Sequence, residues 1–209
     1  MLRMNLIGAL TLIAAGCAQA EPTATAAPAS TAAATKKLYL DVHELGTVNA
    51  KAVAEAHKKD LAVQGKYNVE FKAYWVDEKQ GKVFCLAEAP SADALKRVHE
   101  EAHGLIPKTI MEVTSDNMSW SPAPGKMLFL DMHRLGAGKV TPEAVADAHK
   151  KDLAVQGKYG VRYLDYWFDK DTGTVMCLSE APDAESAIRV HKEAHGLVPD
   201  SIDEVSEGR

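Results

Sequence analysis

The chain is poor in residues that mark several common classes of protein. Only three of its 209 residues are cysteines, which excludes a disulfide-stabilised scaffold. The formal charge is −5 and no basic run occurs, so the lysine and arginine clusters that neutralise nucleic-acid phosphates are missing. The apolar run at residues 6–16 is too short to span a bilayer. We therefore expect no nucleic-acid partner.

The first twenty residues are typical of a bacterial export signal, with Arg3 preceding the apolar run. Two cleavage sites compete. Cleavage after residue 16 would follow a lipobox and leave Cys17 acylated, whereas cleavage after Ala20 would follow "AQA". We predict that residues 1–20 are an export signal. Whether the protein is periplasmic or a lipoprotein anchored through a lipid on Cys17 stays open.

Residues 21–36 are rich in alanine, threonine and proline and show no hydrophobic periodicity. Such a segment cannot bury enough apolar surface to offset its ordering entropy. The composition predicts a disordered tether.

The remainder is an internal duplication. The string "AHKKDLAVQGKY" occurs at 56–67 and again, unchanged, at 148–159. Around it, "LYLDVHELG", "VFCLAEAP" and "RVHEEAHGLIP" each have a near-copy later in the chain. The pattern predicts a first repeat at 37–113, a linker at 114–125 and a second repeat at 126–206.

Each repeat has the pattern β-α-β-β-α-β, which indicates an α+β, ferredoxin-like unit. In the first repeat the expected elements are a strand at 38–43, a helix at 50–66, a hairpin of 69–76 and 82–88, a helix at 91–103 and a strand at 109–113. The strands are apolar on both sides, so we expect the two open sheet faces to pack together about a pseudo-twofold axis, as in a fused dimer. We also expect the first and third strands to be parallel neighbours and the two helices to run in one direction.

A polar stripe lies on the side of the first helix that should be buried. His57, Asp60 and Gln64 fall on the same side as Val53, at helical spacing. The second repeat carries His149, Asp152 and Gln156 at the matching positions. Burying such groups without partners costs several kcal/mol, so they must be bonded to one another or hold a cation.

The second helix adds a histidine pair. In "HEEAH", His99 and His103 lie one turn apart, a spacing that lets both rings reach one Ni, Zn or Cu ion. The string matches the metalloprotease pattern H-E-x-x-H, but "HKEAH" at 191–195 breaks it in the second repeat, and we expect no protease.

The first strand contributes Asp41 and His43, two residues apart and so on one side. A parallel third strand would bring Glu88 to the same end as His43. Whether strand and helix groups form one site or two stays open. All eight histidines of the chain fall in these groups. The candidate metal ligands are His43, His57, Asp60, Glu88, His99, His103, His133, His149, Asp152, Glu180, His191 and His195.

Cys85 and Cys177 occupy equivalent positions in mid-strand. Three interpretations stay open: small buried hydrophobes, thiolate ligands, or a mutual bond across the pseudo-axis. Tyr74 and Trp75 are expected in the core.

The motifs "LDVHELG", "AHKKDLAVQGKYNVEFKAYW", "GKVFCLAEAP" and "VHEEAHGL" resemble a family of small nickel-binding bacterial proteins, otherwise catalogued as a domain of unknown function. The resemblance covers both repeats. It implies a ferredoxin-like fold, dimeric association of such domains and bound nickel. The nitrogen and carboxylate ligands by themselves also suit zinc or copper. This chain differs in carrying two fused units behind an export signal.

Three functions are compatible with these patterns. The first is an exported, non-enzymatic protein that binds nickel or a similar ion for sequestration or delivery. The second is a dimeric α/β-barrel-type enzyme that uses a His–Asp pair as general base. The third is a structural envelope lipoprotein whose polar stripe only braces the fold.

Overall fold

The computed structural model describes residues 35–115 and 120–209. The predicted export signal at 1–20, Cys17 and nearly all of the predicted tether lie outside these residues. Among the described helices, none combines the length and the apolar character needed to cross a bilayer. The described residues belong to one compact unit.

Each repeat contains the expected order of strands and helices. In the first repeat the elements are β1 (Lys37–Glu44), α1 (Ala50–Val63), β2 (Glu70–Asp77), β3 (Lys82–Ala89), α2 (Ala92–Ala102) and β4 (Thr109–Val113). In the second they are β5 (Leu128–Arg134), α3 (Pro142–Val155), β6 (Arg162–Asp169), β7 (Thr174–Glu180), α4 (Ala184–Ala194) and β8 (Ser201–Gly208). The predicted helix 50–66 ends earlier than expected, because residues 64–67 form a 3₁₀ turn.

The residues that precede α1 and α2 cap these helices with their side chains. Asn49 accepts a hydrogen bond from the Ala52 N–H at 2.9 Å, and Ser91 accepts one from the Ala94 N–H at 3.1 Å. These bonds satisfy backbone donors that have no partner inside the helix. The caps fix where α1 and α2 start, and so which helix positions lie over the sheet.

The strands form one eight-stranded sheet in the order β4-β1-β3-β2-β8-β5-β7-β6. Every pairing in it is antiparallel, including β1 with β3. The expectation of a parallel first and third strand is therefore wrong. It follows that β1 and β2 point one way, whereas β3 and β4 point the other way. Because α1 connects β1 to β2 and α2 connects β3 to β4, the two helices run in opposite directions, and the expectation that they run in one direction is also wrong.

The sheet continues from one repeat into the other instead of forming two separate layers. β8 pairs with β5 and then, through its last residues, with β2, where Glu207 lies opposite Trp75. Gly208 is required there, because a Cβ on it would lie 2.1 Å from the Tyr74 ring. At the other edge Thr114 and Phe168 exchange backbone hydrogen bonds of 2.9 and 3.0 Å. The sheet thus nearly closes into a barrel.

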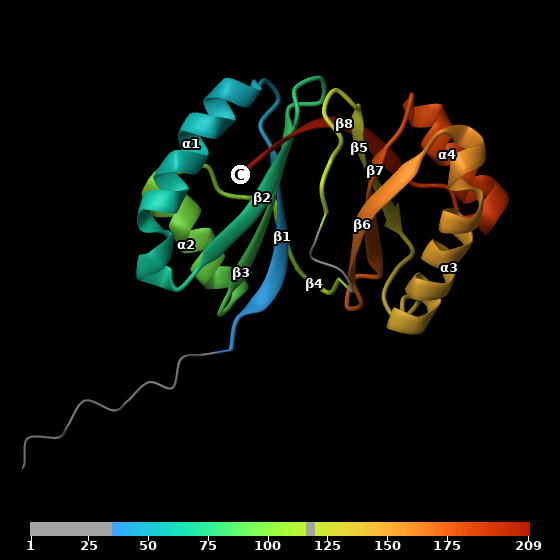
Figure 1. Ribbon diagram of the computed structural model, residues 1–209. Coiled ribbons are helices and arrows are strands. Elements are labelled where there is room, and N and C mark those ends of the chain that lie inside the picture. Colours follow the sequence, from blue (N-terminus) through green and yellow to red (C-terminus); the bar gives the residue numbers. More distant parts are fainter. Residues whose placement is uncertain (1–34, 116–119) are drawn as a thin grey trace, which may run out of the picture. The chain divides into compact units, whose positions relative to one another are not determined.

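The inside of this barrel is a core to which both repeats contribute. Trp75 and Phe84 of the first repeat are buried with Trp167 and Met176 of the second. Figure 1 shows α1 and α2 against one half of the sheet and α3 and α4 against the other, where each pair covers a separate apolar cluster. The strands are apolar on both sides because each faces helices on one side and the shared core on the other.

The predicted linker contributes to that core. Trp120 is 7% exposed and lies with its ring centroid 5.6 Å from those of Trp75 and Trp167. Glu207 accepts hydrogen bonds from the indole N–H groups of Trp120 (2.7 Å) and Trp75 (3.1 Å). Composition predicted a Pro/Gly/Ser spacer here, and the single tryptophan was the available signal for a buried anchor.

Candidate metal centre

Polar side chains from β1, α1 and α2 meet under the helices of the first repeat. Along β1, Leu40 and Val42 enter the shared core, so Asp41 and His43 point to the helices. This settles the direction that two-sided apolar strands left open. Asp41, His43 and Asp60 are at most 4% exposed, and His99 is 1% exposed. With His103 they form a group that we call the histidine cluster.

His99 is held between two carboxylates. Its Nε2 lies 3.0 Å from Asp41 Oδ2 and its Nδ1 lies 3.1 Å from Asp60 Oδ1. His103 Nε2 is 3.2 Å from Asp60 Oδ1 and 3.4 Å from His99 Nδ1. His43 Nε2 lies 3.2 Å from Asp41 Oδ1. Strand and helix groups therefore form one connected cluster, with His99 common to both.

The charges of the cluster are mutually stabilising. Burial would raise the pKa of Asp60, but hydrogen bonds with His103 and His99 outweigh it and lower that pKa to about 2. Burial would also raise the pKa of Asp41, but hydrogen bonds with His43 and His99 outweigh it and lower that pKa. For His99, burial lowers the pKa, yet the bonds with Asp41 and Asp60 raise it to about 9. The metal-free cluster thus holds His99 as an imidazolium between two carboxylates.

The donor atoms have the spacing of a metal site. Nδ1 of His99, Oδ1 of Asp60 and Nε2 of His103 form a triangle with edges of 3.1, 3.2 and 3.4 Å. Bonds of about 2.1 Å in tetrahedral geometry keep ligand atoms about 3.4 Å apart, so the triangle fits with little movement. A second group, Asp41, His43, Cys85 and His99, also brings one donor atom each within 4.8 Å of the others.

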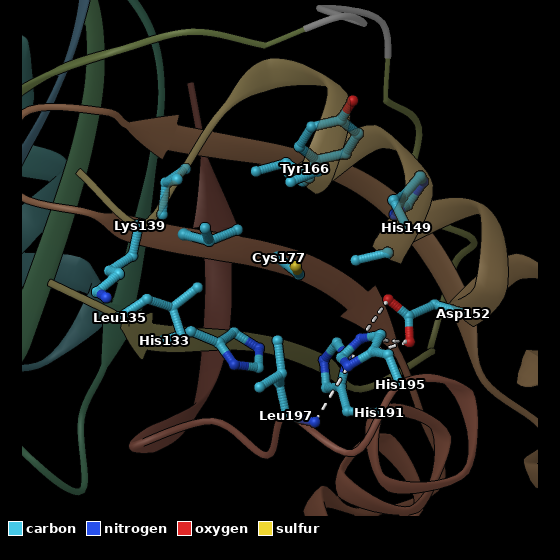
Figure 2. A pocket seen from close by; sticks show the side chains of 15 residues that line it. His133, Leu135, Lys139, His149, Asp152, Tyr166, Cys177, His191, His195 and Leu197 are labelled. Atoms are coloured by element: carbon cyan, nitrogen blue, oxygen red, sulfur yellow. Dashed lines mark hydrogen bonds and ion pairs between the residues drawn. The ribbon is translucent and has the colours of Figure 1, made fainter. Parts of the chain in front are cut away.

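The second repeat reproduces the cluster. His191 lies between Asp131 and Asp152 at 3.1 Å each, and His195 Nε2 lies 3.2 Å from Asp152 Oδ1. Figure 2 shows Asp152, His191 and His195 converging at one end of a pocket, with His133 beside them. The pKa of His191 is raised to about 9 by bonds with Asp131 and Asp152, against the effect of burial. One addition is present: the Tyr163 hydroxyl lies 3.0 Å from His191 Nε2.

His57 lies beside the cluster rather than within it. Its ring packs against Tyr74, with 4.6 Å between centroids, and its Nδ1 is buried without a hydrogen-bond partner among the described residues. Burial lowers its pKa, in spite of the nearby Asp60. His57 and Asp60 both line a cavity of about 230 Å³ that ends at the cluster. Its counterpart His149 borders a cavity of about 130 Å³ in the second repeat.

Gln64 and Gln156, which belong to the polar stripe, have a structural role. Each side-chain oxygen accepts the N–H of a residue at the start of the next strand, Phe71 at 2.9 Å and Tyr163 at 2.8 Å. They join helix to sheet, as the bracing interpretation of the stripe expects.

Glu88 and Glu180 lie away from the cluster. In the antiparallel register Glu88 faces Leu38, whereas His43 faces Val83 near the other end of β3. Glu88 lies 3.2 Å from Lys72 in an ion pair. Glu180 accepts hydrogen bonds from Arg162 at 2.7 and 3.0 Å. Their selection depended on the parallel register, which the structure does not have.

Cys85 and Cys177 are both free and buried, each under the helices of its own repeat. The interpretation that Cys85 and Cys177 form a disulfide with each other is therefore wrong. Burial, together with Asp41 and Asp60, raises the pKa of Cys85 well above its usual range, so the thiol form is favoured. Asp41 was recognised in the sequence but not ranked as a ligand; a carboxylate repeated at Asp131 in otherwise apolar strands was the signal.

Comparisons with known proteins agree with the duplication. The family profile described as nickel-responsive protein, SCO4226-like, matches residues 39–113 and 129–205. The crystal structure of SCO4226 from Streptomyces coelicolor A3(2) is 42% identical over 37% of this chain and 93% of that chain, with a TM-score of 0.35. One repeat thus corresponds in length to nearly all of that protein. No curated protein matches the chain.

Solved structures of low identity cover most of the chain. A mutant chlorite dismutase from Candidatus Nitrospira defluvii is 6% identical over 84% of this chain and 92% of its own, with a TM-score of 0.51. A heme-binding protein from Thermus thermophilus is 11% identical over 84% of this chain and 88% of its own, with a TM-score of 0.39. The first likeness concerns the fold alone.

Proposed function

The chain belongs to the SCO4226-like family of nickel-responsive proteins, and on this premise we propose that it binds one transition-metal ion in each repeat. Nickel is the first choice because the family is described by its response to that metal. Imidazole and carboxylate donors also suit zinc and copper. The ligands are Asp60, His99 and His103 in the first repeat and Asp152, His191 and His195 in the second.

The observation that carries this proposal is the triangle of donor atoms, present twice with edges of 3.1 to 3.4 Å. Behind it, Asp41 accepts the other ring N–H of His99, an arrangement that commonly orients metal-binding histidines and raises their basicity. Asp41 is therefore a supporting residue and not a direct ligand.

Metal binding at this site competes with protons. His99 Nδ1 must lose its proton to offer a lone pair, and its pKa of about 9 means that the proton is present at neutral pH. Uptake should therefore release protons and weaken as pH falls. The same competition applies to His191.

We further propose the cellular setting and the finer architecture. The N-terminal pattern supports export to the periplasm, with or without a lipid on Cys17. There the protein would sequester or deliver its ion without catalysis. The order of elements and the strand order β4-β1-β3-β2 within the first repeat support two ferredoxin-like units related by a pseudo-twofold axis.

The competing functions make different predictions. Asp60 forms its hydrogen bonds with His99 and His103, so a His57–Asp60 general base is not what the geometry favours. The bracing role is favoured by the hydrogen bonds that join His99 to Asp41 and Asp60. It predicts no metal uptake.

Elemental analysis of the protein purified without an affinity tag, after dialysis against nickel, tests the proposal. We expect one ion per repeat, a loss of one with either His103→Ala or His195→Ala, and a loss of both in the double variant. These histidines are chosen because they are partly exposed and disturb the fold least. Glu88→Gln is the matched control and should keep both ions. Full retention of metal in the double variant would contradict the assignment.

A further inference from the structure

We propose that the cavity beside the histidine cluster of the first repeat binds a small uncharged aromatic molecule with the size and polarity of a phenol. The proposal requires no bound metal and assigns a use to the space that the cluster leaves free.

The cavity has the right size and character for one substituted ring. Its volume is about 230 Å³, and its apolar wall is formed by Leu45, Val48, Val53, Tyr74, Val83 and Leu105. An apolar protein cavity of about 150 Å³ is known to bind benzene. The space here therefore takes a ring with one or two added atoms.

One end of the cavity is polar, which orients a ligand. His57 is 5% exposed, lines this space and leaves Nδ1 without a partner among the described residues. A neutral imidazole offers one donor and one acceptor, and buried polar groups without partners are rare. The ring of His57 thus has unused hydrogen-bonding capacity next to the cavity. Nδ1 itself is buried, so a turn of the ring about its Cβ–Cγ bond brings this nitrogen to a ligand hydroxyl.

The charges near the polar end select against anions. Two carboxylates, Asp41 and Asp60, share one buried histidine, His99, between them. A carboxylate on the ligand would meet Asp60, which lines the cavity, with Asp41 close behind His99; repulsion between like charges is stronger beside the mostly apolar wall than in bulk water. The cavity therefore suits a phenol and disfavours a benzoate of the same shape.

The second repeat provides a natural comparison. Its cavity has the same kind of wall but only about 130 Å³, and Lys139, from the loop before α3 that is two residues longer than in the first repeat, lines it. Figure 2 shows Lys139 and Leu135 at the end opposite to Asp152 and His195. This space falls short of the benzene example, so we expect a single bound ring per chain, in the first repeat.

Titration of the metal-free, full-length chain with 4-fluorophenol, followed by fluorine NMR, tests the proposal. We expect saturable binding of one molecule per chain. Ala56→Phe, which places a ring in the first cavity, should weaken binding at least tenfold, and the matched Ala148→Phe in the second repeat should leave it unchanged. 4-Fluorobenzoate should bind at least tenfold more weakly than the phenol.

Absence of saturation, equal effects of the two variants, or equal binding of the benzoate would each overturn the proposal. Circular dichroism checks that Ala56→Phe folds, and Ala52→Leu at the same wall is the alternative if it does not. Nickel uptake of these variants is measured separately, so a failure of the metal assignment cannot be confused with a failure of this one.

Discussion

The two repeats hold the same cluster of aspartates and histidines in different surroundings. His99 and His191 are each fixed between two aspartates at 3.0 to 3.1 Å. Phe71 lies beside the first with 5.4 Å between ring centroids, and Tyr163 lies beside the second at 5.3 Å, where it adds a hydroxyl. The clustered aspartates and histidines are therefore duplicated, whereas the hydrogen-bond network around them has one more member in the second repeat.

The two junctions between the repeats also differ. β8 extends along β2 over three register pairs, whereas the opposite edges, in the part of the chain that the structure describes, pair at the Thr114–Phe168 bridge. At the longer junction Lys82 and Asp203 form an ion pair of 2.6 Å, and the residue equivalent to Asp203 in β4 is the apolar Met111. The two repeats have thus diverged where they join each other, whereas the cluster within each repeat is retained.

The largest effect that both clusters share should appear on raising the pH of the metal-free protein. A histidine whose pKa rises from 6.5 to about 9 on folding stabilises the folded state fully below about pH 6.5, and this contribution is lost as pH approaches 9. Each histidine should account for roughly 3 kcal/mol. At the acid side Asp60, with a pKa of about 2, loses its contribution as pH falls below 3.8.

Urea unfolding at closely spaced pH values measures this dependence, and the NMR signals of the two imidazole rings identify the groups. Free energies of unfolding that stay level between pH 6.5 and 9 would contradict the imidazolium state of both clusters. A fall of half the expected size, with only one ring titrating near pH 9, would show that the clusters differ in charge.

Removing one carboxylate should destabilise the two repeats to different extents. Asp41→Ala leaves His99 Nε2 without its partner, and breaking a buried ion pair in this way costs about 4 kcal/mol. Asp131→Ala should cost about 1 kcal/mol less, because Tyr163 can still accept the hydrogen bond from His191 Nε2. Urea unfolding at pH 6 compares the two variants. Equal losses would mean that the tyrosine hydroxyl does not support His191.

The sequence was sufficient to find most of the cluster because helical spacing and duplication act together. Asp60, His99 and His103 of the cluster, and His57 beside it, fall on the buried side of the predicted helices, and each has an identical residue in the second repeat. Periodicity says which side of an element a residue lies on, and on helices with one charged side that was enough. On β1 both sides are apolar, so the direction of Asp41 and His43 could not be decided.

What the sequence did not supply was the relation between elements. Glu88 was selected on a parallel register, and nothing local in β1 or β3 distinguishes that register from the antiparallel one. The antiparallel helices bring Asp60, rather than His57, to His99. The positions of Trp120 and Thr114 are set by contacts between the repeats, and a pattern within one repeat carries no information about such contacts.

The smallest and sharpest test exchanges the residue that distinguishes the two supporting networks. Tyr163→Phe removes the hydroxyl at 3.0 Å from His191 Nε2 and should cost about 1 kcal/mol, because His191 keeps both of its aspartates. Phe71→Tyr places a hydroxyl at the equivalent position beside His99 and should recover a similar amount in the double variant. Unfolding free energies measure the exchange, and the imidazole nitrogen shifts of His99 and His191 should change places with it. If Tyr163→Phe costs nothing and Phe71→Tyr destabilises, the hydroxyl is tolerated only by the second repeat, and the two clusters differ in packing as well as in hydrogen bonding.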